Sequence, residues 1–218
     1  MRCVRPSLRL RRHRGDGMKT DVMFIGVGGQ GILTAISIIG EAAIRNGTQV
    51  IMSEVHGMAQ RGGTVEAHVR LGDVNSPLIP DRSAEVLVAF EPSEALRGAG
   101  KVSPDGIIVV NMAPIYPFTV SLGQEEYPPV DAIVEALRGA ARHVVALDAL
   151  SIAERTGSTL SVNMVMLGAL VGTGALPLST DILREGITLR LPQKFHAPSL
   201  AAFDEGVAAA SELFAVAD

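Results

Sequence analysis

Two glycine-rich stretches hold most of the residues in this 218-residue chain whose types and spacing suit ligand binding. The first reads GVGGQG from Gly26 to Gly31, and the second reads EVHGMAQRGG from Glu54 to Gly63. Glycine allows backbone conformations that are closed to other residues, and an arginine held among glycines offers a planar fork of donors to a carboxylate or phosphate. The two stretches therefore predict a site for an anion.

The candidate contacts to a ligand or to an interface come from both stretches. They are Gly26, Gly28, Gly29, Gln30, Gly31, Glu54, His56, Gly57, Gln60, Arg61, Gly62 and Gly63. The plainer alternative is that the glycines only turn the chain, with Arg61 and His56 as solvated loop residues. Loops of this composition commonly carry function, but they need not.

The elements around the first stretch predict how it is positioned. An apolar run ends at Gly26, and residues 32–44 carry apolar side chains at helical spacing up to a stop signal at Asn46-Gly47. This is the pattern of a strand, a tight turn and a helix, in which the first amides of the helix face an anion. The second stretch follows another predicted strand. In an open parallel sheet, ligands bind beyond the carboxyl ends of the strands, so the two stretches are expected to converge.

Strand and helix patterns alternate along the rest of the chain. The expected strands are 64–71, 85–90, 106–111 and 144–148, and the expected helices are 92–98, 131–141, 163–172, 180–189 and 200–214. The fold class is α/β: a three-layer, Rossmann-like, mostly parallel sheet covered by helices, formed by residues 18–218 as a single domain. The proline-containing segment 113–129 is too long for an ordinary connection, and we expect it to be a surface excursion or a partner-facing arm.

A dinucleotide site is the main alternative for the first stretch. Gly26, Gly28 and Gly31 fit the G-x-G-x-x-G fingerprint, and Glu54 stands about where a ribose-binding acid belongs. This pattern predicts a free-standing NAD(P)-binding Rossmann-like dehydrogenase or a non-catalytic regulator. The second stretch favours another interpretation, because a nicotinamide site needs little after its acidic residue.

The composition bounds the chemistry and the compartment. Cys3 is the only cysteine, so the chain has too few thiolates for an iron–sulfur cluster and cannot form an internal disulfide, which suits the cytoplasm. There is no uninterrupted apolar run long enough for a membrane span, and His68 and His143 show no metal-ligand spacing. Neither G-x-S-x-G nor H-E-x-x-H is present, which favours a subunit over a complete enzyme.

Residues 1–17 differ from the rest of the chain. They contain six arginines and one acid and show no core-forming pattern, so we expect a disordered basic extension. It imitates an organellar transit peptide, but an upstream translation start before Met18 is the plainer explanation. Without those six arginines and that one acid, 13 basic and 22 acidic residues remain, a net charge of −9. A body this acidic argues against a nucleic-acid partner.

Several motifs in one order make the sequence recognisable. Beside the two glycine-rich stretches these are VRLG at 69–72, SPLIP at 76–80, FEPSEALR at 90–97, VVN at 109–111, YP at 127–128 and SVNMVMLGAL at 161–170. Together they resemble the gamma-type subunit of the 2-oxoacid:ferredoxin oxidoreductases, and the likeness covers nearly everything from Met18 onward. It extends furthest to members that act on aryl pyruvates such as indolepyruvate.

The resemblance implies a division of labour between two chains. A large partner subunit would hold thiamine diphosphate and 4Fe–4S clusters, decarboxylate the oxoacid, reduce ferredoxin and pass the acyl group to coenzyme A. This chain would be the accessory subunit, inactive alone, with no cofactor or metal of its own and no catalytic residue that the pattern identifies. Which oxoacid is used, which anion occupies the glycine-rich site and how many subunits assemble stay open.

Overall fold

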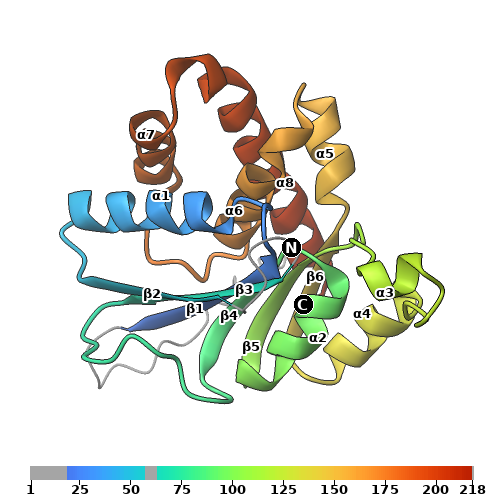
Figure 1. Ribbon diagram of the computed structural model, residues 1–218. Coiled ribbons are helices and arrows are strands. Elements are labelled where there is room, and N and C mark those ends of the chain that lie inside the picture. The colour runs from blue at the N-terminus through green and yellow to red at the C-terminus, as the bar shows by residue number, and fades with distance from the viewer. Residues whose placement is uncertain (1–18, 57–62, 218) are drawn as a thin grey trace, which may run out of the picture.

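The computed structural model describes residues 19–56 and 63–217 (Figure 1). Its elements in chain order are β1 (Thr20–Val27), α1 (Ile32–Arg45), β2 (Val50–His56), β3 (Thr64–Leu71), β4 (Ala84–Ala89), α2 (Pro92–Gly98), η1 (Ala99–Lys101), β5 (Val102–Asn111), α3 (Phe118–Ser121), α4 (Val130–Arg138), β6 (His143–Leu147), α5 (Ala149–Arg155), η2 (Thr159–Ser161), α6 (Val162–Gly172), α7 (Thr180–Arg190), η3 (Gln193–Phe195) and α8 (His196–Ala217). None of these helices has the length and apolar character needed to span a lipid bilayer.

The six strands form one sheet in the order β2-β3-β1-β4-β5-β6. The pairs β1–β4, β4–β5 and β5–β6 are parallel, whereas β3 runs antiparallel to both of its neighbours, β1 and β2. The connection between β2 and β3 is too short for a parallel crossover, which needs a dozen or more residues. The expected mostly parallel α/β sheet is confirmed, with β3 as a reversed strand that places the second glycine-rich stretch in a hairpin connection.

Helices cover both faces of the sheet and give it three layers (Figure 1). Val22 and Phe24 of β1 pack on the face covered by α1 and α5–α8, and the alternate residues Met23 and Ile25 pack on the face covered by α2 and α4. All four of these side chains are buried, as expected for a strand covered on both sides. The two apolar cores hold the carboxyl ends of β1, β4 and β5 at one edge.

Each expected helix is present, and the structure adds α5, the four-residue α3 within the segment 113–129 and the 3-10 helices η1, η2 and η3. The short helix α5 was not expected from the sequence. It begins directly after β6, where the Asp148 side chain accepts a hydrogen bond from the Ser151 amide and so caps the helix. The bounds differ most at α4, which ends at Arg138 instead of residue 141, and at α8, which starts four residues earlier than the expected helix. The apolar stripe in α6 is core, since Met164 and Met166 are both buried.

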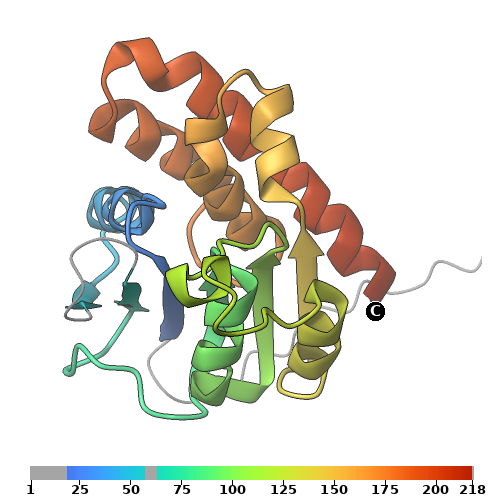
Figure 2. The same ribbon diagram turned by 45° about the vertical axis from the view of Figure 1, so that its right-hand side comes forward.

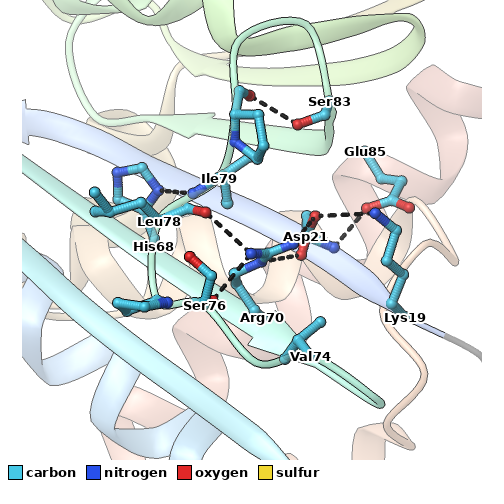
Figure 3. Close-up of polar contacts among 12 residues, drawn as sticks. Lys19, Asp21, His68, Arg70, Val74, Ser76, Leu78, Ile79, Ser83 and Glu85 are labelled. Atoms are coloured by element: carbon cyan, nitrogen blue, oxygen red, sulfur yellow. Dashed lines mark hydrogen bonds and ion pairs between the residues drawn. The ribbon is translucent and has the colours of Figure 1, made fainter.

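A buried ion pair joins β1 to β3 (Figure 3) and lies on the sheet face that carries Met23 and Ile25, because alternate residues of a strand share one face. Arg70 of β3 donates through Nε and Nη2 to the two carboxylate oxygens of Asp21, at 2.7 and 3.0 Å. Its Nη1 donates to the carbonyls of Ser76 and Leu78, which belong to the connection that covers this face. The carboxylate contact raises the pKa of Arg70 further. We call Asp21, Arg70, Ser76 and Leu78 the Arg70 cluster.

Candidate functional site

The first glycine-rich stretch forms a tight turn at the carboxyl end of β1. Gly29 and Gly31 have φ values of 103° and 77°, and a residue with a side chain would be strained in these backbone conformations. At Gly26, a Cβ would lie 2.6 Å from Gln30 Oε1 and 2.8 Å from the Phe90 Cβ, so only glycine lets β1 and β4 approach this closely. Gly31 is the N-cap of α1, and no side chain caps the helix. The first amides of α1 are therefore left to water or to a ligand.

Gln30 has a structural role in this turn. Its Oε1 accepts a hydrogen bond from the Val27 amide at 2.7 Å, and its Nε2 donates to the Phe90 carbonyl at 2.8 Å. The sequence analysis took Gln30 as a candidate ligand contact. In the structure its carboxamide ties the turn after β1 to the end of β4, although the residue still lines the open space above the turn.

Asn111 extends this hydrogen bonding along the sheet edge, and the sequence analysis did not select it. Its Nδ2 donates to the same Phe90 carbonyl at 3.1 Å, while its Oδ1 accepts from the Ala149 amide at 3.1 Å. Gln30 and Asn111 thus connect the ends of β1, β4 and β5 and the start of α5 without any charge. We call these two carboxamides the edge amides. The signal in the sequence was a polar residue directly after a buried apolar strand.

Two pockets open above the edge amides and share Gly29, Gln30 and Gly31 as lining residues. The pocket of about 330 Å³ lies over the start of α1 and is bounded on one side by Val65 of β3. The other, of about 280 Å³, lies between the glycine turn and the start of α6. Its lining consists of Gly29, Gln30, Gly31, Asn111, Ala113, Pro114, Ile115, Leu150, Thr159, Leu160, Val162 and Asn163. This lining combines neutral amides with an apolar wall.

Asn163 joins α6 to the glycine turn across the second pocket. Its Nδ2 donates to the Gly31 carbonyl at 3.3 Å, and a Cβ on Gly31 would lie 2.6 Å from that nitrogen. Gly31 is therefore required both by its positive φ and by a neighbour that is 132 residues away in the sequence. From the sequence, residue 163 is expected only as the start of a helix and as part of the motif at 161–170.

The second glycine-rich stretch reaches the first at its last residue. The Gly28 amide donates to the Gly63 carbonyl at 2.9 Å, so the two stretches adjoin at the carboxyl edge of the sheet. His56 ends β2, where its main chain pairs opposite Val65. The other candidates of this stretch, Gly57, Gln60, Arg61 and Gly62, lie outside the described residues.

The position of Glu54 separates this fold from a dinucleotide-binding one. In a Rossmann fold the strand with the ribose-binding acid lies directly beside the first strand. Here β3 lies between β1 and β2, and Glu54 pairs opposite Ala67 of β3. Two strand spacings, roughly 10 Å, therefore separate Glu54 from the line of β1. The geometry argues against the G-x-G-x-x-G interpretation.

Two glutamates lie at the start of α2, at the same edge. Glu91 is fully buried, and its carboxylate accepts hydrogen bonds from the amides of Glu94 and Ile115 and from the Tyr127 hydroxyl. Glu94 is also buried; its Oε1 lies 3.4 Å from Arg97 Nε, and its Oε2 has no hydrogen-bond partner. Burial raises the pKa of Glu94 and, with help from Glu91, that of Tyr127.

No metal centre is evident among the residues the structure describes, where no group of three or more His, Cys, Asp or Glu side chains could hold an ion. His68, for example, lies under the connection that follows β3. Its Nδ1 accepts a hydrogen bond from the Ile79 amide, and its Nε2 is 2.7 Å from Glu66 Oε1. The carboxyl edge of the sheet thus offers main-chain donors, neutral amides and pockets, which are features of a binding site.

Comparisons with known proteins identify the family of this chain. The family model for pyruvate ferredoxin/flavodoxin oxidoreductase matches residues 21–209, nearly the whole described chain. The chain belongs to the pyruvate ferredoxin/flavodoxin oxidoreductase family. It is thus related to subunits of 2-oxoacid:ferredoxin oxidoreductase complexes.

Three relatives differ in how much of their own length this chain matches. Indolepyruvate oxidoreductase subunit IorB of Methanothermobacter thermautotrophicus is 42% identical, over 89% of this chain and 100% of that protein. The gamma subunit of a keto/oxoacid ferredoxin oxidoreductase from Geobacter sulfurreducens has a solved structure that matches with a TM-score of 0.65 at 25% identity, over 88% of this chain and 99% of that one. Ketoisovalerate oxidoreductase subunit VorA of M. thermautotrophicus is 28% identical over 76% of this chain but only 31% of its own length.

Proposed function

We propose that this chain is the small subunit of an indolepyruvate:ferredoxin oxidoreductase. The proposal is supported by the full-length likeness to subunit IorB at 42% identity. In this complex a large subunit holds thiamine diphosphate and 4Fe–4S clusters, and ferredoxin takes the electrons. The cytoplasm is the expected compartment for such a complex.

The chain's own contribution is to bind the acyl acceptor, coenzyme A. The observation that carries this assignment is the uncapped start of α1 at Gly31, which opens into two pockets that share the glycine turn. A helix start of this kind receives a phosphate without a charged side chain. The pocket between the glycine turn and the start of α6 then offers amides and an apolar wall to an extended, mostly uncharged chain, such as the one that joins the phosphates of coenzyme A to its thiol.

A carboxylate of the large subunit is the other anion that suits the turn. It needs only the first amides of α1, whereas the second pocket extends to Leu150 and Leu160, well beyond the reach of one carboxylate. Coenzyme A uses the whole surface and is therefore the better fit. Arg61 is the candidate cation beside it, on the basis of its sequence context alone.

Reconstitution of the complex tests the proposed function. The purified chain alone should be colourless, contain no stoichiometric iron or thiamine and fail to oxidise indolepyruvate, since its single cysteine cannot ligate a cluster. Coexpression with the large subunit should give a brown complex that reduces ferredoxin or a viologen dye when both indolepyruvate and coenzyme A are supplied. Turnover by the isolated chain, or bound iron in it, would overturn the proposal.

A substrate panel then tests which oxoacid the complex prefers. The complex should be assayed with indolepyruvate, ketoisovalerate, 2-oxoglutarate and pyruvate at equal concentrations. The expected result is the highest kcat/KM for indolepyruvate. A preference for one of the other three would leave the subunit role intact and reassign only the oxoacid.

A further inference from the structure

Exposed apolar side chains border the pocket between the glycine turn and the start of α6. Residues 113–129, which we call the proline arm, carry Ile115, Tyr116, Phe118 and Leu122, and all four side chains are exposed. Phe118 is 76% exposed, and Leu160 of η2, which lines the same pocket as Ile115, is 81% exposed. Large apolar side chains exposed beside a pocket mark an interaction site more often than isolated exposed residues do.

The proline arm is held in place from beneath, so its apolar side chains are presented in a fixed arrangement. The Ile115 amide and the Tyr127 hydroxyl both donate to the buried Glu91 Oε1, which ties both ends of the arm to the start of α2. Figure 2 shows the ribbon of the arm between β5 and α4. The Tyr116 and Tyr127 rings meet edge to face, with centroids 5.1 Å apart. Ordering the arm in advance removes part of the entropy cost of binding.

The charged residues of the proline arm have one sign. Residues 113–129 contain the acidic residues Glu125 and Glu126 and no lysine or arginine. A partner suited to this surface therefore has an apolar centre with lysine or arginine at its rim. Such complementarity sets the choice of partner and the orientation of docking.

We infer that the proline arm and Leu160 form the docking surface for the large subunit, an inference that rests on the proposed function. In the VorA relative the matched region is 31% of a longer chain, so this fold also occurs covalently joined to further protein. The surface borders the pocket through Ile115 and Leu160, and docking there brings the large subunit to the mouth of the coenzyme A site. The acyl group must cross that boundary between the two chains.

The central test is Phe118→Asp, which places a charge in the middle of the surface. Assembly is measured by mixing the separately purified full-length subunits and fitting the Kd from thermophoresis. Phe118→Asp should weaken assembly by roughly thirtyfold or more, the scale of losing an aromatic side chain at the centre of an interface. Leu160→Asp should weaken it in the same direction. The control is Ile44→Asp at the far end of α1, where Ile44 is 69% exposed.

Charge reversal provides an independent test of the same docking surface. Glu126→Lys should weaken assembly and slow association most at low ionic strength, whereas Glu212→Lys on α8 should leave both unchanged. Circular dichroism of each variant alone checks that the fold is kept. If the unaltered subunits pair but Phe118→Asp and Leu160→Asp pair as tightly, the docking surface is wrong while the proposed function stands.

Two other outcomes are equally decisive. Failure of the unaltered subunits to pair would overturn the proposed function itself. If the unaltered chain alone sediments as a dimer, and Phe118→Asp converts it to a monomer without weakening the complex, the surface belongs to a second copy of this chain and the docking proposal is wrong.

Discussion

The Arg70 cluster and the edge amides are two polar networks in one sheet, built in opposite ways. The Arg70 cluster is charged and closed: Arg70 is only 7% exposed, and its guanidinium donates to the Asp21 carboxylate and to two carbonyls. The edge amides are neutral and lie beneath open pockets and an uncapped helix start. Buried charges must be fully partnered, whereas a binding edge must keep donors free for its ligand.

This contrast teaches which polar residues to interpret as functional. The charged Arg70 side chain, bonded to a carboxylate and two carbonyls, secures the connection that covers β3. The residues that shape the proposed site are glycines and carboxamides, whose value lies in leaving space and main-chain donors. Variants that disturb the two regions should therefore fail in different ways.

Breaking the Arg70 cluster should have the largest effect. Arg70→Met leaves the buried Asp21 carboxylate with only the half-exposed Lys19, 3.7 Å away, as a cationic partner, which should lower the free energy of unfolding by about 3–5 kcal/mol. The double variant Asp21→Leu with Arg70→Met should recover part of that loss, because no unpaired charge remains. Urea denaturation of the purified chain measures both.

The matched control is Arg184→Met, since Arg184 pairs with Asp204 at the surface. Its cost should be below about 1 kcal/mol, as for other exposed pairs. Equal losses for Arg70→Met and Arg184→Met would contradict the view that the Arg70 cluster is a closed structural network.

A change at the glycine turn should affect function more than stability. At Gly29 φ is 103° and a Cβ would meet no neighbouring atom, so Gly29→Ala costs only backbone strain of about 1–3 kcal/mol while its methyl enters the binding space. The KM for coenzyme A of the assembled complex should rise roughly tenfold or more, the scale of losing one charge-assisted hydrogen bond.

Gly47→Ala provides the comparison for that experiment. Gly47 also has a positive φ, of 69°, and open space at its Cβ position, but it follows the far end of α1. The strain should therefore be similar and the KM for coenzyme A unchanged. Equal KM values for the two variants would show that the glycine turn does not contact coenzyme A.

The smallest expected effect concerns Glu94, the one buried carboxyl at the binding edge that keeps an unpartnered oxygen. Burial raises its folded-state pKa, so the folded protein binds this proton more tightly than the unfolded chain does. Wild type should then lose stability relative to Glu94→Gln as pH rises from about 4 to about 8, and the difference should be smallest at the acidic end.

Denaturant titrations across that range measure the pH dependence, with the exposed Glu126→Gln as the control. A stability difference between wild type and Glu94→Gln that stays constant with pH would show that ionisation of Glu94 has no cost in the folded protein.

Much of the local structure was predictable from the sequence. Apolar periodicity located α1, α2, α4, α6 and α7 and every strand of the sheet, because side-chain spacing depends only on nearby residues. The turn at Gly26–Gly31 was likewise predictable, since a strand that ends in glycines before an amphipathic helix has one common geometry. The antiparallel direction of β3 was also predictable, because the connection between β2 and β3 is too short for a parallel crossover.

The candidate site was predictable only in part. Both glycine-rich stretches were identified, and the contact between Gly28 and Gly63 joins them as expected. Asn111 and Asn163 were missed as site residues, and Gln30 was interpreted as a ligand contact although its carboxamide binds main chain. A side chain's partner depends on strand order, which no local pattern contains.

The sequence by itself determined the elements, the glycine turn and the family resemblance, because these depend on residue types at short spacing. Only the tertiary structure decided that β3 separates Glu54 from β1, that Glu91 holds the proline arm and that Asn163 faces Gly31. Those contacts join residues tens to more than a hundred positions apart, and they form only when the two apolar cores bring the strands into one order. The physical reason is that hydrogen bonding between distant residues is a consequence of packing, and packing belongs to the whole chain.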